Sequence, residues 1–290
     1  MTENTDDALT IACIQFAPVF GDVAGNLARS VEMIGRAADA GARIVVLPEL
    51  ANTGYVFRSR AEALALAEPV PDGPSSRAWA AVAAERGVIV AAGIAERDGG
   101  RLFNSAVLLG PEGPMGVYRK LHLWGEENLW FEPGDRGVPV WPTPYGRIAV
   151  AICYDGWFPE VFRLAAVQGA DLVCVPTNWV PIPGQAPDRP PMANVLHMAA
   201  AHSNSMVIAC ANRVGVERGQ PFIGHSLIVA HTGWPAAGPA GGDTEEIVLA
   251  TVDPTAARRA RNWNAFNDPL RDRRTDLYAE ALGADIGGRR

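Results

Sequence analysis

The chain alternates between short apolar runs and longer stretches in which apolar and polar residues recur at helical spacing. The apolar runs, several of them rich in β-branched residues, predict buried strands at residues 9–16, 43–50, 88–94, 101–109, 148–153, 171–176 and 206–211. Apolar positions three or four residues apart predict helices at residues 26–40, 75–86, 160–168 and 192–203. Strands that alternate with helices pair in parallel and are covered by those helices, so the pattern predicts an α/β fold.

The segments between these elements complete the pattern. A turn with the sequence Pro-Glu-Gly-Pro joins residues 107–109 and 116–120 in a predicted antiparallel hairpin. Residues 122–135 are dense in aromatic and acidic side chains and are expected to form a loop. Residues 226–230 and 246–252 are predicted to form a final pair of strands.

No linker divides the chain, and we expect a single domain over residues 9–254. Residues 1–8 are polar and acidic and are expected to form a disordered tail. Residues 255–290 are arginine-rich with apolar side chains interspersed, which is typical of an arm that packs on the domain or across a dimer interface. These apolar side chains are Trp263, Phe266, Leu270, Leu277 and Tyr278.

Charge and hydropathy exclude several classes of partner. The net charge is −7, whereas a protein that binds nucleic acid needs a basic face. No apolar run approaches the ~20 residues of a bilayer-spanning helix, and the polar N-terminus does not resemble a signal peptide. We therefore expect no nucleic-acid partner, no membrane partner and a cytoplasmic location.

The cysteines and histidines lack the spacing of a metal site. Cys13, Cys153, Cys174 and Cys210 lie far apart in apolar segments and form no CxxC pair, which favours reduced thiols over disulfides. The five histidines include no HExxH motif. We therefore expect no metal and no cofactor.

Three ionisable residues stand where an apolar strand ends and the backbone leaves the predicted sheet. They are Glu49 in Val-Val-Leu-Pro-Glu-Leu, Lys120 in Val-Tyr-Arg-Lys-Leu-His-Leu, and Cys153 in Ile-Ala-Val-Ala-Ile-Cys-Tyr-Asp. Ligand sites in open α/β sheets lie outside the carboxyl ends of strands. A carboxylate, an ammonium and a thiol at such an edge are the parts of an acyl-transfer site.

These parts have complementary roles in that chemistry. The Glu49 carboxylate would take the proton of the thiol and later activate water. The Cys153 sulfur would attack an electrophilic carbon, and the Lys120 ammonium, helped by a backbone N–H after the nucleophile, would stabilise the oxyanion.

The three segments together resemble the nitrilase superfamily of carbon–nitrogen hydrolases, which use a Glu-Lys-Cys triad. The motifs occur in the family's order and spacing, and the similarity extends from Leu9 to about Tyr278. The resemblance implies that Glu49 is the general base, Lys120 the oxyanion-stabilising group and Cys153 the nucleophile. It also implies a four-layer α-β-β-α sandwich that forms a homodimer or a higher homo-oligomer through its helical faces.

Many members of the superfamily carry a second catalytic glutamate six residues before a Pro-Gly pair. Glu127 matches this pattern before Pro133-Gly134. Glu126 and Glu132 are close in the sequence, so the pattern alone leaves them as alternatives.

The residues after Cys153 bear on the substrate. Nitrile hydrolases of the superfamily carry Trp-Glu there, whereas this chain has Tyr154-Asp155, which is similar to the amidase pattern. Branches that bind carboxylate-bearing substrates often place arginine three or four residues beyond the nucleophile. Gly156 and Trp157 stand there instead, which argues against a substrate carboxylate because a guanidinium fork is its natural partner.

Several side chains are candidates for the pocket wall. We expect the small Gly156 to leave space in it, and the substrate-binding candidates are Tyr55, Trp124, Trp130, Tyr154, Trp157, Asn178 and Trp179.

The sequence thus predicts a cysteine-dependent amidohydrolase that cleaves a small neutral or cationic carboxamide, through a thioester, to a carboxylic acid and ammonia. A nitrilase or an N-carbamoyl amide hydrolase on the same triad is the alternative activity. An inactive interaction module would not need the three residues, and a thiol-based redox protein would need a resolving cysteine in sequence reach.

Overall fold

The computed structural model describes residues 8–186 and 188–281, and its core consists of two six-stranded sheets. The first sheet has the order β14 (Glu246–Val252), β1 (Leu9–Gln15), β2 (Ala42–Val46), β3 (Ile89–Asp98), β4 (Arg101–Gly110) and β5 (Gly113–Arg119). The second has the order β13 (Pro235–Ala237), β12 (Leu227–Val229), β9 (Val207–Ala211), β8 (Leu172–Pro176), β7 (Gly146–Val150) and β6 (Val140–Thr143). The central strands β1–β2–β3 and β7–β8–β9 are parallel, as predicted.

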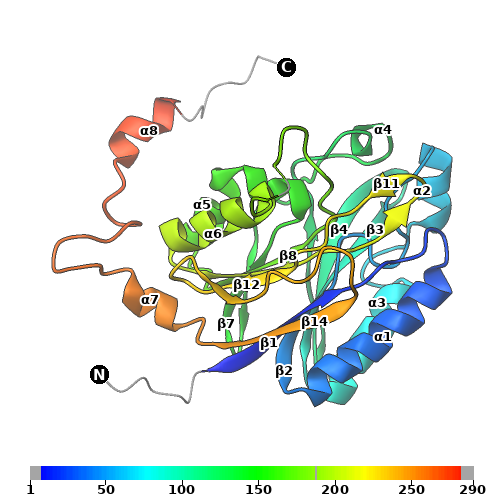
Figure 1. The fold of residues 1–290 in the computed structure, drawn as a ribbon, viewed down its shortest axis with the longest axis horizontal. Coiled ribbons are helices and arrows are strands. Elements are labelled where there is room, and N and C mark those ends of the chain that lie inside the picture. The colour runs from blue at the N-terminus through cyan, green and yellow to red at the C-terminus, as the bar shows by residue number, and fades with distance from the viewer. Residues whose placement is uncertain (1–7, 187, 282–290) are drawn as a thin grey trace.

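Helices cover the outer face of each sheet (Figure 1). Helices α1 (Val23–Asp39) and α3 (Pro74–Arg86) pack on the first sheet, and α5 (Pro159–Val167) and α6 (Met192–Asn204) lie over the second. The expected four-layer α-β-β-α sandwich is therefore confirmed. The smaller elements are α2 (Arg60–Leu66), α4 (Glu127–Trp130), the 3₁₀ helix η2 (Cys153–Trp157), β10 (Val216–Glu217), β11 (Gln220–Pro221), α7 (Ala256–Ala260) and α8 (Thr275–Ala281).

Local sequence signals set the ends of the large helices. The Asp22 side chain caps α1 by accepting from the N–H of Gly25. Helix α3 begins with Pro74, whose missing N–H costs nothing in the first turn, and ends at Gly87 in the left-handed conformation. These caps leave the apolar face of each helix free to pack on the sheet.

The apolar side chains of the strands divide between two cores. One face of the first sheet packs with α1 and α3, and the opposite face packs against the second sheet. Because both faces are covered, the central strands are apolar at nearly every position. The carboxyl ends of β2 and β8 lie close together, since the N–H of Glu49 donates to the carbonyl of Thr177 at 3.4 Å.

Two predictions were wrong. Residues 226–230 and 246–252 do not pair: β12 lies between β9 and β13, whereas β14 pairs with β1 in the other sheet. A pattern of apolar residues predicts strands but does not specify their partners. The segment 122–135 is not only loop, because it contains the short helix α4.

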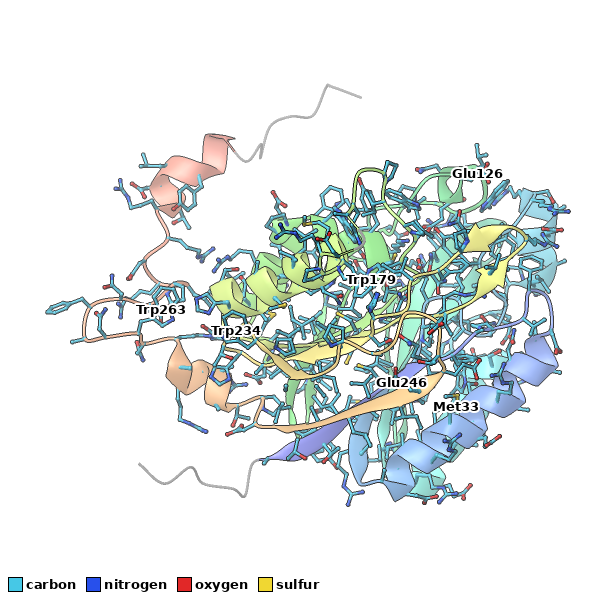
Figure 2. All side chains as sticks on the ribbon, in the orientation of Figure 1. Met33, Glu126, Trp179, Trp234, Glu246 and Trp263 are labelled. Atoms are coloured by element: carbon cyan, nitrogen blue, oxygen red, sulfur yellow. The ribbon has the colours of Figure 1, made fainter. Side chains whose placement is uncertain are left out.

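The two terminal segments are described in part. Residues 1–7 of the predicted tail and residues 282–290 of the predicted arm lie outside the described residues. The described portion of the arm contacts the domain: Arg258 pairs with the buried Asp171 at 2.6 Å, and the Trp263 ring stacks on His202. Figure 2 shows where Trp263 lies. Phe266 remains 82% exposed. Within the part of the chain that the structure describes, none of the helices combines the length and apolar character of a membrane span.

Candidate active site

Cys153 lies in a strained turn after β7. It is the first residue of η2 and has a φ of +48°, which is uncommon for a residue with a side chain. The buried Asp155 carboxylate holds this turn by accepting from the N–H of Ile152 at 2.9 Å, the hydroxyl of Tyr118 at 2.7 Å and the N–H of His122 at 3.0 Å. The turn is thereby fixed to β5 and to the segment after Lys120.

Glu49 follows β2 and is fully buried. Its Oε1 accepts from the Lys120 Nζ at 2.6 Å and from the Asn104 Nδ2 at 2.7 Å, whereas its Oε2 has no hydrogen-bond partner. Strand β3 approaches the backbone here so closely that a Cβ on Gly93 would lie 2.5 Å from the Glu49 Cα. Only glycine fits at position 93, and its close packing against the backbone holds Glu49 in place.

Lys120 joins two carboxylates. Besides Glu49, its Nζ donates to the Glu127 Oε1 at 2.8 Å and Oε2 at 2.9 Å, and Lys120 itself is fully buried. The Tyr55 hydroxyl donates to the Glu127 Oε1 at 2.6 Å. Of the three neighbouring glutamates, Glu126 is exposed and Glu132 lies 3.9 Å from Arg60, so the structure brings only Glu127 to the lysine.

Two acids and one base in a buried space perturb one another. Burial raises the pKa of Glu49 to about 7, and the Lys120 ammonium opposes this rise. Burial alone would lower the pKa of Lys120, but the carboxylates of Glu127 and Glu49 raise it above its ordinary value. These shifts favour the charged form of Lys120 and bring the pKa of Glu49 close to neutral.

The thiol is protonated at rest. Burial and the Glu49 carboxylate raise the pKa of Cys153, whereas Lys120, the Thr177 hydroxyl and the Asn178 N–H lower it by smaller amounts. The net effect is a pKa well above the ordinary value for cysteine. A thiol in this state needs a base beside it before it can act as a nucleophile.

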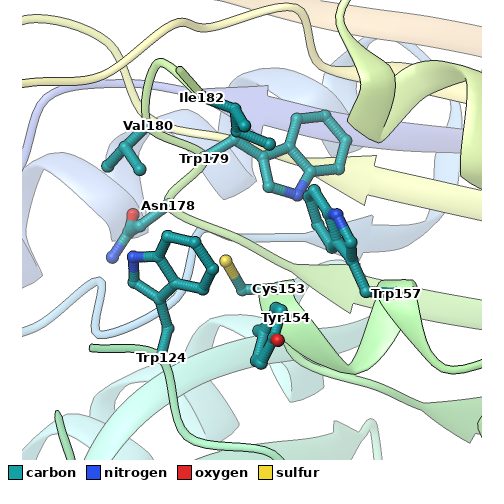
Figure 3. A pocket seen from close by; sticks show the side chains of 8 residues that line it. All are labelled: Trp124, Cys153, Tyr154, Trp157, Asn178, Trp179, Val180 and Ile182. Carbon is teal, nitrogen blue, oxygen red and sulfur yellow. The ribbon is translucent and has the colours of Figure 1, made fainter. Parts of the chain in front are cut away.

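The Cys153 sulfur points into a cavity (Figure 3). Five predicted substrate-binding residues line it: Trp124, Tyr154, Trp157, Asn178 and Trp179. Val180 and Ile182 complete the lining, which contains no charged residue. The Tyr154 ring packs edge-on against Trp124, with centroids 4.9 Å apart.

Three pocket predictions differ from the structure. Trp130 is not among the lining residues and packs against the cluster that contains Phe57 and Phe131. Tyr55 is not among them either, because its hydroxyl faces Glu127. Gly156 leaves space for a protein side chain, since a Cβ there would lie 2.5 Å from the ring of the buried His197.

Two unpaired polar groups lie beside the cavity. The Asn178 Nδ2 donates to the carbonyl of Glu49 at 2.9 Å, which leaves its buried Oδ1 without a partner. The Trp179 Nε1 is also buried and unpaired. Buried polar groups usually have partners, so this acceptor and this donor are available to a polar ligand.

Sequence reasoning missed Asn104, which bridges the two carboxylates from β4. Its Nδ2 lies 2.7 Å from Glu49 and 3.4 Å from Glu127. The available signal was an amide inside the largely apolar run of residues 102–109. Thr177, which lowers the pKa of Cys153, is likewise a polar residue that directly follows an apolar strand, β8.

No metal site emerges from residues 8–186 and 188–281, which contain no cluster of three or more histidine, cysteine, aspartate or glutamate side chains suited to an ion. The expected independence from metals stays a prediction.

Comparison with known proteins gives a consistent result. The family model of carbon-nitrogen hydrolases matches residues 10–262. A nitrilase of Pyrococcus abyssi is 38% identical over 92% of this chain and 98% of its own length, and an N-carbamoylputrescine amidase of Solanum lycopersicum is 33% identical over 96% of each. A solved amidase variant of Nesterenkonia sp. AN1, with the acetamide moiety of fluoroacetamide added covalently at its active-site cysteine, is 26% identical with a TM-score of 0.77, covering 94% of this chain and 96% of that one.

Proposed function

The chain belongs to the carbon-nitrogen hydrolase family and acts on carbon–nitrogen bonds other than peptide bonds, and we propose that it is an amidase that converts a small carboxamide to a carboxylic acid and ammonia. One observation carries this proposal: the buried Glu49–Lys120–Glu127 cluster beside Cys153, in which the Glu49 Oε2 has no partner. An unpaired carboxylate oxygen with a pKa of about 7 is suited to exchange protons at neutral pH.

In the acylation half of the reaction, Glu49 accepts the thiol proton as the Cys153 sulfur bonds to the carbonyl carbon. The carbonyl π electrons move to oxygen, and the oxyanion is stabilised by the Lys120 ammonium. When the tetrahedral intermediate collapses, Glu49 returns the proton to the nitrogen, the C–N bond breaks and ammonia leaves. The product on the protein is a thioester.

Deacylation uses the same groups. Glu49 takes a proton from water while the water oxygen attacks the thioester carbon, and Lys120 again stabilises the oxyanion. Collapse breaks the C–S bond, and the proton held by Glu49 returns to sulfur. The carboxylic acid is released, and Glu127 keeps the lysine positioned throughout through its two contacts of 2.8 and 2.9 Å.

The cavity supports an acyl group without a negative charge. No lining residue is charged, so a substrate carboxylate would be buried without a partner. Four aromatic rings favour an apolar group and can also attract a cation through their faces. The acetamide moiety bound to the cysteine of the Nesterenkonia amidase is likewise a small group without a negative charge.

The alternative is a nitrilase or an N-carbamoyl amide hydrolase on the same residues, and the names of the Pyrococcus and Solanum relatives favour it. Ammonia release from matched panels of amides, nitriles and ureido compounds distinguishes these activities. We expect amides to give the highest kcat/KM and a Cys153→Ala variant to release none. Preferential turnover of a nitrile or a ureido compound would overturn the amidase assignment, and no turnover of any panel member would support the inactive module.

We also propose that the protein is a cytoplasmic homo-oligomer. Helices α5 and α6 expose Leu164, Val167, Met192 and Val195, and burial of such side chains against a second copy would remove apolar surface from water. Four free cysteines fit a reducing compartment. Light scattering after size-exclusion chromatography tests the assembly, and a monomer at micromolar concentration would refute it.

A further inference from the structure

Arg213 and Glu217 form a buried ion pair that takes no part in the proposed reaction. Arg213 follows β9, and Glu217 ends β10. Their charged atoms, Arg213 Nη1 and Glu217 Oε2, are 2.6 Å apart, and the two side chains are 2% and 5% exposed. Burying both charges removes them from water, and such a pair seldom adds net stability over apolar residues of similar size.

The pair holds the backbone of the segment that carries Tyr55. The Glu217 Oε1, the oxygen not bound to arginine, accepts from the N–H of Tyr55 at 2.7 Å and from the N–H of Val56 at 2.5 Å. A carboxylate that accepts two adjacent backbone N–H groups fixes the orientation of that peptide more firmly than a single neutral acceptor does.

The same pair also holds the ring of Tyr55. The Arg213 guanidinium lies 4.2 Å from the centroid of Phe222, and the Phe222 ring meets the Tyr55 ring edge-on with centroids 5.9 Å apart. The Arg213 Nη2 is itself fixed by donating to the carbonyl of Pro18 at 3.0 Å. One buried ion pair therefore holds the backbone of Tyr55 by a hydrogen bond and its ring through Phe222.

Tyr55 connects the ion pair to the cluster of Glu49, Lys120 and Glu127. Its hydroxyl donates to the Glu127 Oε1, which in turn accepts from Lys120. Burial and the carboxylates of Glu127 and Glu49 raise the pKa of Tyr55 well above its ordinary value, so the hydroxyl remains a donor across the physiological range.

We propose that Glu217 and Arg213 are positioning residues for catalysis, which act through the Tyr55 hydroxyl to fix Glu127 and hence the Lys120 ammonium. This proposal rests on the proposed function of Lys120 and Glu127. Without the Tyr55 hydrogen bond, Glu127 can rotate and draw Lys120 away from the place where the oxyanion forms. A displaced donor lowers kcat more than it raises KM, because the oxyanion exists only in the transition state and the intermediates.

A double-mutant cycle tests the proposal. Tyr55→Phe removes the hydroxyl, and Glu217→Ala/Arg213→Met removes the ion pair without leaving a buried unpaired charge. In the wild-type background the ion-pair variant should lower kcat about tenfold to a hundredfold, the effect of losing one charge-assisted hydrogen bond. In the Y55F background the same change should lower kcat less than twofold further.

The control is Glu62→Gln. Glu62 of helix α2 forms a 2.8 Å ion pair with Arg218, which lies between β10 and β11, and this pair does not include Tyr55. The control variant should keep the wild-type kcat. Equal losses on adding the ion-pair variant to the wild-type and the Y55F backgrounds would show a general structural role and overturn the proposal. Should the ion-pair variant fail to fold, Glu217→Gln/Arg213→Met takes its place in the cycle, because it keeps an acceptor for the two N–H groups and leaves no buried unpaired charge. The same non-additivity with Y55F is expected.

A second readout separates this proposal from the proposed function. The rate of Cys153 alkylation by iodoacetamide needs no substrate, yet it depends on the groups around the thiol. If the wild type hydrolyses no amide, nitrile or ureido compound, the proposed function fails while the alkylation rates still complete the cycle. Additive alkylation rates would then refute the positioning role, and non-additive rates would support it.

Discussion

The two sides of the active site are built differently. On one side lies the polar cluster, made of Tyr55, Asn104, Glu127 and the charged pair Glu49 and Lys120, in which every side chain has a partner within the protein. On the other side lies the aromatic wall, made of Trp124, Tyr154, Trp157 and Trp179. In the polar cluster, Asn104 lies on β4, Glu49 and Lys120 follow strands of the first sheet, and Glu127 begins α4. In the aromatic wall, Tyr154 and Trp157 lie in η2, and Trp124 and Trp179 follow β5 and β8.

This difference predicts that the polar cluster determines the rate of the reaction and the aromatic wall determines the choice of substrate. Fixed hydrogen bonds hold charges where they develop in the transition state, so changes in the polar cluster should act on kcat. Aromatic rings with few polar contacts provide shape and exclude water, so changes in the wall should act on the choice of substrate.

The largest effect is expected at the nucleophile, where the two sides meet. Cys153→Ala should abolish activity, and Cys153→Ser should be nearly inactive because a hydroxyl is a much poorer nucleophile at neutral pH. Iodoacetamide should inactivate the enzyme with one dominant label at Cys153, since Cys13, Cys174 and Cys210 are fully buried in the core. Peptide mapping of the label checks this, and retained activity in Cys153→Ala would refute covalent catalysis.

The next effect concerns the polar cluster. Lys120→Ala should lower kcat at least ~10²-fold, as removal of an oxyanion donor does in other enzymes. Lys120→Arg should not restore it, because a planar guanidinium cannot take the place of a compact ammonium between two carboxylates. Steady-state kinetics decide the matter: an unchanged kcat with a raised KM would make Lys120 a substrate anchor.

The aromatic wall predicts selection by charge. An amino-acid amide should be used at least tenfold better, in kcat/KM, than the corresponding N-carbamoyl amino acid. A buried carboxylate without a partner costs on the order of 1–3 kcal/mol, and ~1.4 kcal/mol corresponds to tenfold. Arg163 and Arg213 are held elsewhere by hydrogen bonds to carbonyl groups, which leaves Arg189 as the cation to examine if both substrates react equally.

The smallest effect is a pH dependence. Glu49 acts as a base only when ionised, and burial raises its pKa to about 7. The rate should therefore be full above pH 7 and fall as the pH drops through that value, by about tenfold per pH unit well below it. The residual activity of Glu49→Gln should lack this acid limb. An acid limb near the ordinary glutamate pKa would contradict the assignment of the base.

The sequence alone predicted three groups that the structure brings together. Glu49, Lys120 and Cys153 each end an apolar strand, and strand ends are recognisable from local composition. The parallel α/β architecture followed from the alternation of strands and helices in the same way. Both inferences depend on residues that are close in the sequence, because these determine local secondary structure whatever the position of the segment in the fold.

The tertiary structure decided which distant residues meet. It assigned β14 to the sheet of β1, turned Gly156 toward His197, and placed the Tyr55 hydroxyl on Glu127 from 72 positions away along the chain. Such contacts depend on strand order, on register and on the direction in which a side chain leaves the backbone. Periodicity encodes burial, but it does not encode the partner that a buried polar group finds, because that partner is chosen by the packing of the whole core.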